Sequence, residues 1–209
     1  MQISHVASGF VQASRAVPDV LLEARYYTTY NFIGDRIAGY EAPCVMMTRE
    51  AAEALSRAAA ALGEQGYRLK LFDAYRPQRA VEHFAAWARD VSDQRMKPYF
   101  YPEVDKARLF ALGYISLRSN HSRGSTVDLT LFDMQAGREA DMGSPFDYFG
   151  EISHADYTGA LTAEQRGRRA LLRQTMEQCG FRGIQSEWWH FTLAREPYPD
   201  TYFDFPVDW

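Results

Sequence analysis

Cysteine is scarce in this 209-residue sequence, which contains only Cys44 and Cys179. The two residues form no metal-ligand motif, and such low cysteine usage is typical of proteins from reducing compartments. A chain of this length can bury roughly 70% of its unfolded surface on folding, so the fold needs no disulfide or structural metal. A metal bound to this protein is therefore expected to serve function.

Other absences exclude whole classes of protein. The formal net charge is -4 and no basic stripe is present, which argues against a nucleic-acid partner. The longest apolar runs, such as residues 58–62, are far shorter than the ~20 residues of a membrane span. The N-terminus lacks a basic segment followed by an apolar one, so no signal peptide is visible and a cytoplasmic location is expected.

Internal repeats, low-complexity tracts and linkers are also absent, so the chain is expected to form one domain over residues 1–209. Apolar periodicity predicts a helix over about 49–65, a second starting at Pro77, and a third starting at Thr162 with Gln165 completing a capping box. Strands are predicted over 67–74, 126–132 and 188–193. Segregated helices and hairpin-like strands indicate an α+β fold.

Two short stretches carry metal-ligating side chains. The stretch 119–128 and the stretch 187–190 contain, in chain order, His121, Asp128, Glu187 and His190. Two histidines and one aspartate are a common zinc set, which leaves one coordination position open for water, and a nearby carboxylate can take that water's proton. Asp128 is unusual because a carboxylate in mid-strand disfavours the strand unless a cation or an arginine pairs with it.

The spacing alone leaves alternatives open. His121 could be an ordinary loop histidine and His190 a hydrogen-bonded residue of a half-buried strand. Glu187, three positions before His190, would lie on the opposite face of a regular strand, so its use as a base requires a turn or bulge there. Arg76, at a strand-to-helix junction, could stabilise an oxyanion or could be a surface arginine.

These residues, in this order, resemble the VanX-type D-alanyl-D-alanine dipeptidases, within the wider family of zinc D,D-peptidases related in fold to the hedgehog signalling domain. The wider pattern matches Ser119, His121, Gly124, Asp128, Glu187 and His190. The dipeptidase pattern adds residues 73–77, 121–125, 128–131, 142–144, 146–147, 187–190, 196–199 and 202–206. The resemblance covers nearly the whole chain and implies a central, mainly antiparallel sheet flanked by helices. Position 126 is Thr where the wider pattern usually has a small residue such as Ala.

The resemblance also implies roles for individual residues and one Zn²⁺ per chain. When the roles known for the family are carried over to the matching positions, the resemblance implies His121, Asp128 and His190 as the zinc ligands. Glu187 would be the general base and acid, and Arg76 would stabilise the tetrahedral intermediate. Asp147 would receive the free amino terminus of a small D,D-dipeptide, Ser119 would hold the substrate, and Tyr26 would line the pocket.

Hydrolysis of D-Ala-D-Ala to two D-alanines is therefore the expected activity. A D,D- or L,D-carboxypeptidase or cell-wall endopeptidase with a more open cleft is the nearer alternative. A zinc-holding binding module without catalysis is the other, although such a module would need neither Glu187 nor Arg76. The oligomeric state and the physiological role are not indicated by the sequence.

Overall fold

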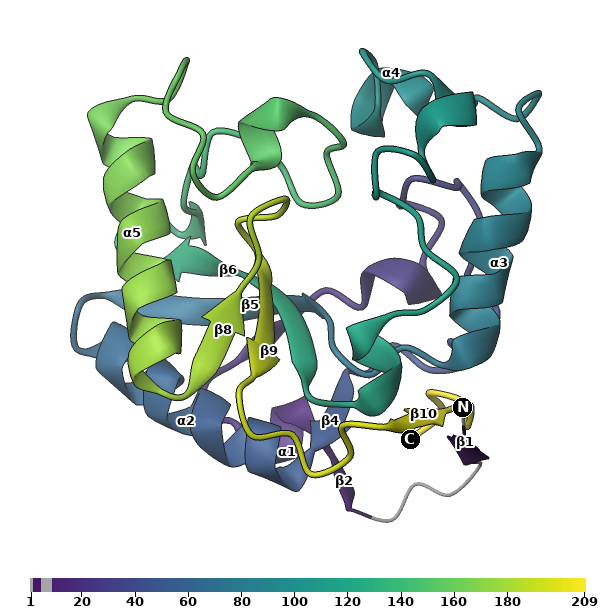
Figure 1. Cartoon of the computed structure of the whole chain (residues 1–209). Helices are drawn as coiled ribbons and strands as arrows, with labels where there is room; N and C mark the ends of the chain where they lie inside the picture. The colour runs from purple at the N-terminus through teal and green to yellow at the C-terminus, as the bar shows by residue number, and fades with distance from the viewer. Residues whose placement is uncertain (1, 5–8) are drawn as a thin grey trace.

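A mainly antiparallel sheet forms the centre of the structure, a computed structural model that describes residues 2–4 and 9–209 (Figure 1). Its strands run in the order β3-β5-β6-β9-β8, with β7 paired to β6, and only the β3–β5 pair is parallel. The strands are β3 (Leu21–Leu22), β5 (Tyr67–Asp73), β6 (Thr126–Asp133), β7 (Arg138–Glu139), β8 (Phe181–Gly183) and β9 (His190–Leu193).

Two further strand pairs lie outside this sheet. The first and last strands, β1 (Gln2–Ser4) and β10 (Thr201–Phe203), pair in parallel. The other pair is antiparallel and joins β2 (Phe10–Gln12) to β4 (Met46–Thr48). These contacts bring the two ends of the described chain to the same side of the molecule (Figure 1).

The longer helices are α2 (Arg49–Gly63), α3 (Gln78–Arg89) and α5 (Ala163–Gln178). Helix α2 packs against β5 and α5 against β8, and the two helices contact each other, whereas α3 lies on the opposite side of the molecule (Figure 1). Short helical segments fill the connections. They are α1 (Ala13–Ala16), η1 (Arg25–Tyr27), α4 (Lys97–Phe100), η2 (Lys106–Arg108), η3 (Asn120–Arg123) and η4 (Glu151–Ser153).

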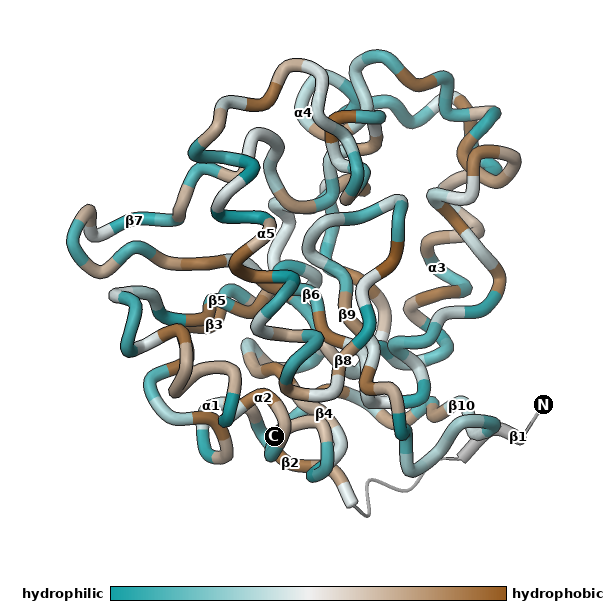
Figure 2. The backbone as a smooth tube through the Cα atoms, turned by 60° about the vertical axis from the view of Figure 1, so that its left-hand side comes forward, coloured by the Kyte–Doolittle hydropathy of each residue, from teal (hydrophilic) through white to brown (hydrophobic). Residues whose placement is uncertain are grey.

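Local sequence explains where the longer helices start. Thr162 accepts a hydrogen bond from the Gln165 backbone, and the Gln165 side chain accepts one from the Thr162 backbone, which completes the predicted capping box. Thr48 caps α2 by a single hydrogen bond, which its side chain accepts from Ala51 N. Pro77 is the N-cap of α3, so this helix begins at Gln78, one residue after the predicted start. The apolar residues of these elements form the core. The exposed turn at β7, in contrast, consists largely of hydrophilic residues (Figure 2).

The structure confirms the α+β class and the mainly antiparallel sheet, with corrections to individual elements. The last predicted strand starts at His190 rather than 188, because Trp188 and Trp189 form a turn. The predicted helix over 49–65 ends at Gly63. Strands β3 and β8 were not predicted, since two or three residues are too few to show an alternating pattern.

Candidate active site

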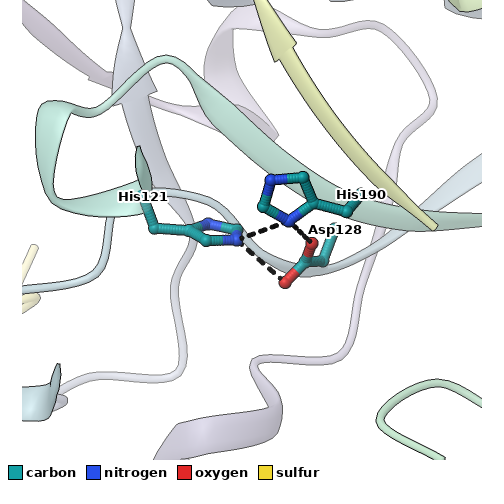
Figure 3. Close-up of side chains that lie close together, drawn as sticks. All are labelled: His121, Asp128 and His190. Carbon is teal, nitrogen blue, oxygen red and sulfur yellow. Dashed lines mark hydrogen bonds and ion pairs between the residues drawn. The ribbon is translucent and has the colours of Figure 1, made fainter. Parts of the chain in front are cut away.

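Three buried side chains from different elements meet at one point (Figure 3). His121 comes from η3, Asp128 from β6 and His190 from β9, and one ligand atom from each lies within 4.8 Å of the others. His121 Nε2 lies 3.2 Å from His190 Nδ1 and 3.1 Å from Asp128 Oδ2. His190 Nδ1 lies 3.1 Å from Asp128 Oδ1. The three predicted ligands therefore converge as a metal site requires.

Sheet register brings two of these side chains together. Asp128 of β6 pairs directly with His190 of β9, so the two side chains lie on the same face of the antiparallel pair. Thr126 and Thr192 are the next pair on that face, and their hydroxyls are 2.8 Å apart. The alternation of β6 and the shared face of His190 and Thr192 were both predictable from sequence. The partner strand and its register were not.

A tight turn delivers the third side chain. Gly124 ends η3 with a φ of 83°, a left-handed conformation that favours glycine, and the chain then enters β6. A Cβ at this position would come within 2.3 Å of the Phe10 ring. Gly124 N donates to His121 O, which fixes the short helical turn that carries the histidine. The glycine therefore places His121 over the face that carries Asp128.

A backbone carbonyl fixes the tautomer of His121. Its Nδ1 lies 2.7 Å from the carbonyl oxygen of Ala74, which can only accept a hydrogen bond. The hydrogen is therefore on Nδ1, and Nε2 presents a lone pair to the cluster. A histidine oriented by a carbonyl in this way is typical of metal sites. Burial lowers the pKa of His121, which favours the neutral ring that a metal needs.

The cluster has an excess of acceptors that a cation would satisfy. The bare Nε2 of His121 faces Asp128 Oδ2, another acceptor, at 3.1 Å. Asp128 Oδ1 is buried, and within the described part of the chain its contact with His190 Nδ1 at 3.1 Å falls short of well-formed hydrogen-bond geometry. For His190, burial lowers the pKa, but the hydrogen bond and the negative charge of Asp128 outweigh it and raise the pKa overall. A His₂Asp set with an unsatisfied carboxylate oxygen fits a zinc ion.

Arg76 lies beside the cluster in the connection between β5 and α3. Its Nη2 is 3.4 Å from Asp128 Oδ2, and its Nε donates to Asp73 Oδ2 at 2.9 Å. Its guanidinium lies 5.0 Å from the ring centres of Tyr26 and Phe84. The arginine is thus held inside the cavity rather than on the surface, and it is one partner of the mid-strand carboxylate.

Asp73 is a site residue that the sequence reasoning did not assign. It is buried, accepts from the Tyr40 hydroxyl at 2.7 Å as well as from Arg76, and lies 3.7 Å from His121 Nδ1. Its position three residues before Arg76 at a strand end was the available signal. Asp73 holds Arg76 in place and faces the proton-bearing side of His121.

Glu187 lies on the same side as His190, as the proposed base requires. The turn at Trp188–Trp189 breaks the strand alternation and brings Glu187 Oε2 to 3.4 Å from His190 Nδ1. Burial raises the pKa of Glu187 above that of an ordinary glutamate, and the negative charge of Asp128 adds to the shift. The sequence required a turn or a bulge at this point, and the structure has a turn.

Tyr26 and Asp147 form a buried pair that lines the same cavity. The Tyr26 hydroxyl donates to Asp147 Oδ2 at 3.0 Å, and both residues are almost fully buried. Asp147 has a φ of 62°, which is uncommon outside glycine and directs the carboxylate into the cavity wall. Burial raises the pKa of Asp147 well above its usual value, and the negative charge of Asp128 raises it further.

One cavity of about 230 Å³ contains all eight predicted site residues. Ser119 lines it from the N-cap of η3, where its Oγ accepts a hydrogen bond from His121 N. The residues that line the cavity and were predicted are Tyr26, Arg76, Ser119, His121, Asp128, Asp147, Glu187 and His190. The volume is below the roughly 300–1,000 Å³ of sites for drug-sized ligands, so the cavity suits a small molecule.

A polar cavity with a His₂Asp cluster that could hold a metal ion, a carboxylate beside it and a buried arginine is typical of metal-dependent hydrolases. Comparison with known proteins narrows the class. A family model described as D-Ala-D-Ala dipeptidase, within the M15 peptidases, matches residues 6–208. The chain belongs to this family.

Individual relatives agree with this assignment. A D-alanyl-D-alanine dipeptidase of Enterococcus faecium is 42% identical over 199 residues, covering 95% of this chain and 98% of the relative. One of Streptomyces coelicolor is 43% identical over 198 residues, covering 95% and 98%. A zinc-bound mutant of the vancomycin-resistance D,D-pentapeptidase VanY aligns with a TM-score of 0.42 and 15% identity over 72% of this chain and 74% of VanY. This last similarity is too low to bear on fold or site.

Proposed function

We propose that this protein is a zinc-dependent dipeptidase that hydrolyses D-Ala-D-Ala to two D-alanines. The observation that carries the proposal is the placement of two functional groups in one small cavity. The His121–Asp128–His190 cluster with Glu187 is one group, and the Tyr26–Asp147 pair is the other. Relatives named D-alanyl-D-alanine dipeptidase, similar over almost their full length, support the substrate.

We assign one zinc ion per chain to His121, Asp128 and His190. Bound there, zinc would supply Lewis-acid polarisation of the substrate carbonyl and lower the pKa of water to about 7. The lone pair of His121 Nε2 and the buried Asp128 Oδ1, which has no well-formed hydrogen bond among the described residues, support this assignment. The carbonyl of Ala74 keeps His121 oriented, and the Asp73 carboxylate lies 3.7 Å from His121 Nδ1.

Glu187 is the proposed general base and acid. Its raised pKa suits a carboxylate that takes the proton of the attacking water and returns it to the leaving amine. Its position 3.4 Å from His190 Nδ1 places it next to the cluster. Arg76, held by Asp73, contributes positive charge where the oxyanion forms.

Asp147 is the proposed receptor for the substrate ammonium, with Tyr26 fixing its carboxylate by the 3.0 Å hydrogen bond. A desolvated ammonium needs a carboxylate partner, and an acylated amine carries no charge to offer. Ser119 lines the same cavity beside His121 and is proposed to help hold the substrate near the metal. These contacts favour a free dipeptide over a long peptide.

The test is release of D-alanine by zinc-loaded protein from three substrates, D-Ala-D-Ala, N-acetyl-D-Ala-D-Ala and L-Ala-L-Ala. Cleavage of the free D,D-dipeptide alone is the expected result. Cleavage of the acetylated substrate would instead assign a carboxypeptidase activity. Zinc binding without hydrolysis of any D,D-peptide would indicate a binding module.

No helix in the described ranges is long and apolar enough to cross a membrane. The cytoplasmic location expected from the sequence stays a prediction, as does the absence of a nucleic-acid partner. Fractionation of cells that produce the full chain would test the location.

A further inference from the structure

A buried arginine outside the cavity joins two parts of the proposed site. Arg169 lies on α5, is 7% exposed, and has no carboxylate oxygen within ion-pair distance in the described part of the chain. Burial lowers its pKa to about 10. A buried cation without a counter-ion is costly, so its hydrogen bonds must satisfy it.

Those hydrogen bonds go to both ends of one loop. Arg169 Nε donates to Met142 O at 2.7 Å, Nη1 to His154 O at 3.1 Å, and Nη2 to Ile152 O at 2.8 Å. The loop between these carbonyls carries Asp147 in its left-handed conformation. The planar fork of one guanidinium therefore closes the loop that presents the ammonium receptor.

The guanidinium of Arg169 is also linked, through a shared serine hydroxyl, to Trp188, the residue that follows Glu187. Ser153 Oγ donates its one hydrogen to Tyr148 O at 2.6 Å. It can therefore only accept from the Ser144 hydroxyl, which lies 3.1 Å away. The lone pairs of Ser144 Oγ then accept from Trp188 Nε1 at 2.9 Å and from Arg169 Nη2 at 3.4 Å. The Trp188 backbone N–H also donates to Ser153 O at 3.0 Å.

We infer that Arg169 is a positioning residue that sets the distance between Asp147 and Glu187, and thereby the selection of a free dipeptide. The inference rests on the proposed function. Arg169 touches neither substrate nor metal, and it acts through the loop 142–154 and through Trp188. The His121–Asp128–His190 cluster is built on η3, β6 and β9 and has no direct contact with Arg169 among the described residues.

The test compares Arg169→Lys with Arg173→Lys. A lysine at 169 keeps the charge but cannot bridge carbonyls at both ends of the loop. Arg173 lies one turn later on α5 and, among the described residues, forms its ion pair with the exposed Glu177, so its replacement is a matched control. Zinc content, kcat and KM for D-Ala-D-Ala are measured on the full chain of wild type and both variants.

The expected result is full zinc content and a KM raised about tenfold in the Arg169→Lys protein, with a smaller change in kcat. Arg173→Lys should match the wild type. A KM equal to the control, with kcat reduced only in proportion to the folded, zinc-loaded fraction, would overturn the inference. An inactive wild type would reject the proposed function itself, so the two failures are distinguishable.

A second variant keeps the inference testable if Arg169→Lys does not fold. Ser144→Ala removes the acceptor shared by Trp188 Nε1 and Arg169 while leaving the three carbonyl contacts in place. It should raise KM in the same direction by a smaller factor. An unchanged KM in a folded Ser144→Ala protein would contradict the link between Trp188 and the loop.

Discussion

One proton position determines the chemistry of the cluster. The Ala74 carbonyl holds the hydrogen of His121 on Nδ1, so Nε2 and Asp128 present only lone pairs to each other. The identities of the proposed ligands could be predicted from the sequence because histidine and aspartate have recognisable chemistry. Ala74 could not, because a backbone carbonyl has no sequence signal.

Replacement of Asp147 by Asn should weaken recognition of the free amine. The amide keeps the size of the side chain but removes the negative charge, so KM for D-Ala-D-Ala should rise about 10- to 100-fold. Steady-state kinetics with Asp200→Asn, an exposed aspartate, as control would measure this. If free and N-acylated substrates respond equally, Asp147 is not the receptor.

The pH dependence of KM provides a second test of Asp147. Its pKa is raised by burial, and a protonated carboxyl cannot pair with an ammonium. The attraction is therefore present above the raised pKa and is lost as the pH falls through it, so KM should increase with falling pH. KM measured over a pH series should show this increase in wild type and lose it in the Asp147→Asn protein.

At the scale of elements, the site depends on the register of β6 with β9 and on the turn that joins η3 to β6. The sequence predicted the alternation of residues 126–132 because a period of two is a local property. It could not predict that Asp128 pairs with His190, because register between strands sixty residues apart depends on tertiary packing. The sequence itself did not indicate the turn at Trp188–Trp189, which was expected only because Glu187 could not otherwise lie on the same side as His190.

Replacement of Gly124 by Ala should disrupt this turn. Both Gly124 and Gly137 have positive φ, but a Cβ at Gly124 would meet the Phe10 ring, whereas nothing lies within 4 Å at Gly137. Gly137→Ala should cost about 1–2 kcal/mol for the left-handed backbone, and Gly124→Ala a further 1–3 kcal/mol or so for the clash. Chemical denaturation of both variants measures the difference. Equal losses would show that the contact with Phe10 is unimportant.

At the scale of the whole molecule, the proposed metal ties η3, β6 and β9 together and should stabilise the fold. A ligand present at about 100 times its Kd contributes about 2.7 kcal/mol, and each 1 kcal/mol shifts the melting temperature by roughly 2–4 °C for a protein of this size. Chelation should therefore lower Tm by several degrees, and added zinc should restore it. His190→Ala should melt at a temperature independent of zinc, and a zinc shift that persists in this variant would contradict the ligand assignment.

The class of fold was accessible from the sequence at this scale too, because the three long helices have strong apolar periodicity and clear start signals. The parallel pairings of β3 with β5 and of β1 with β10 were not, since they join segments distant in sequence with few residues each. The link from α5 through Arg169 to the loop 142–154 is of the same kind, because its acceptors are mostly backbone carbonyls.

The most direct test of the central claim is a paired measurement of zinc content and D-alanine release in the Glu187→Gln protein. The amide has the shape of the glutamate but cannot take a proton from water, and Glu187 is not one of the three proposed ligands. The account predicts one zinc per chain and a loss of turnover of at least about 10²-fold. Near-normal turnover with zinc bound would show that Glu187 is not the base.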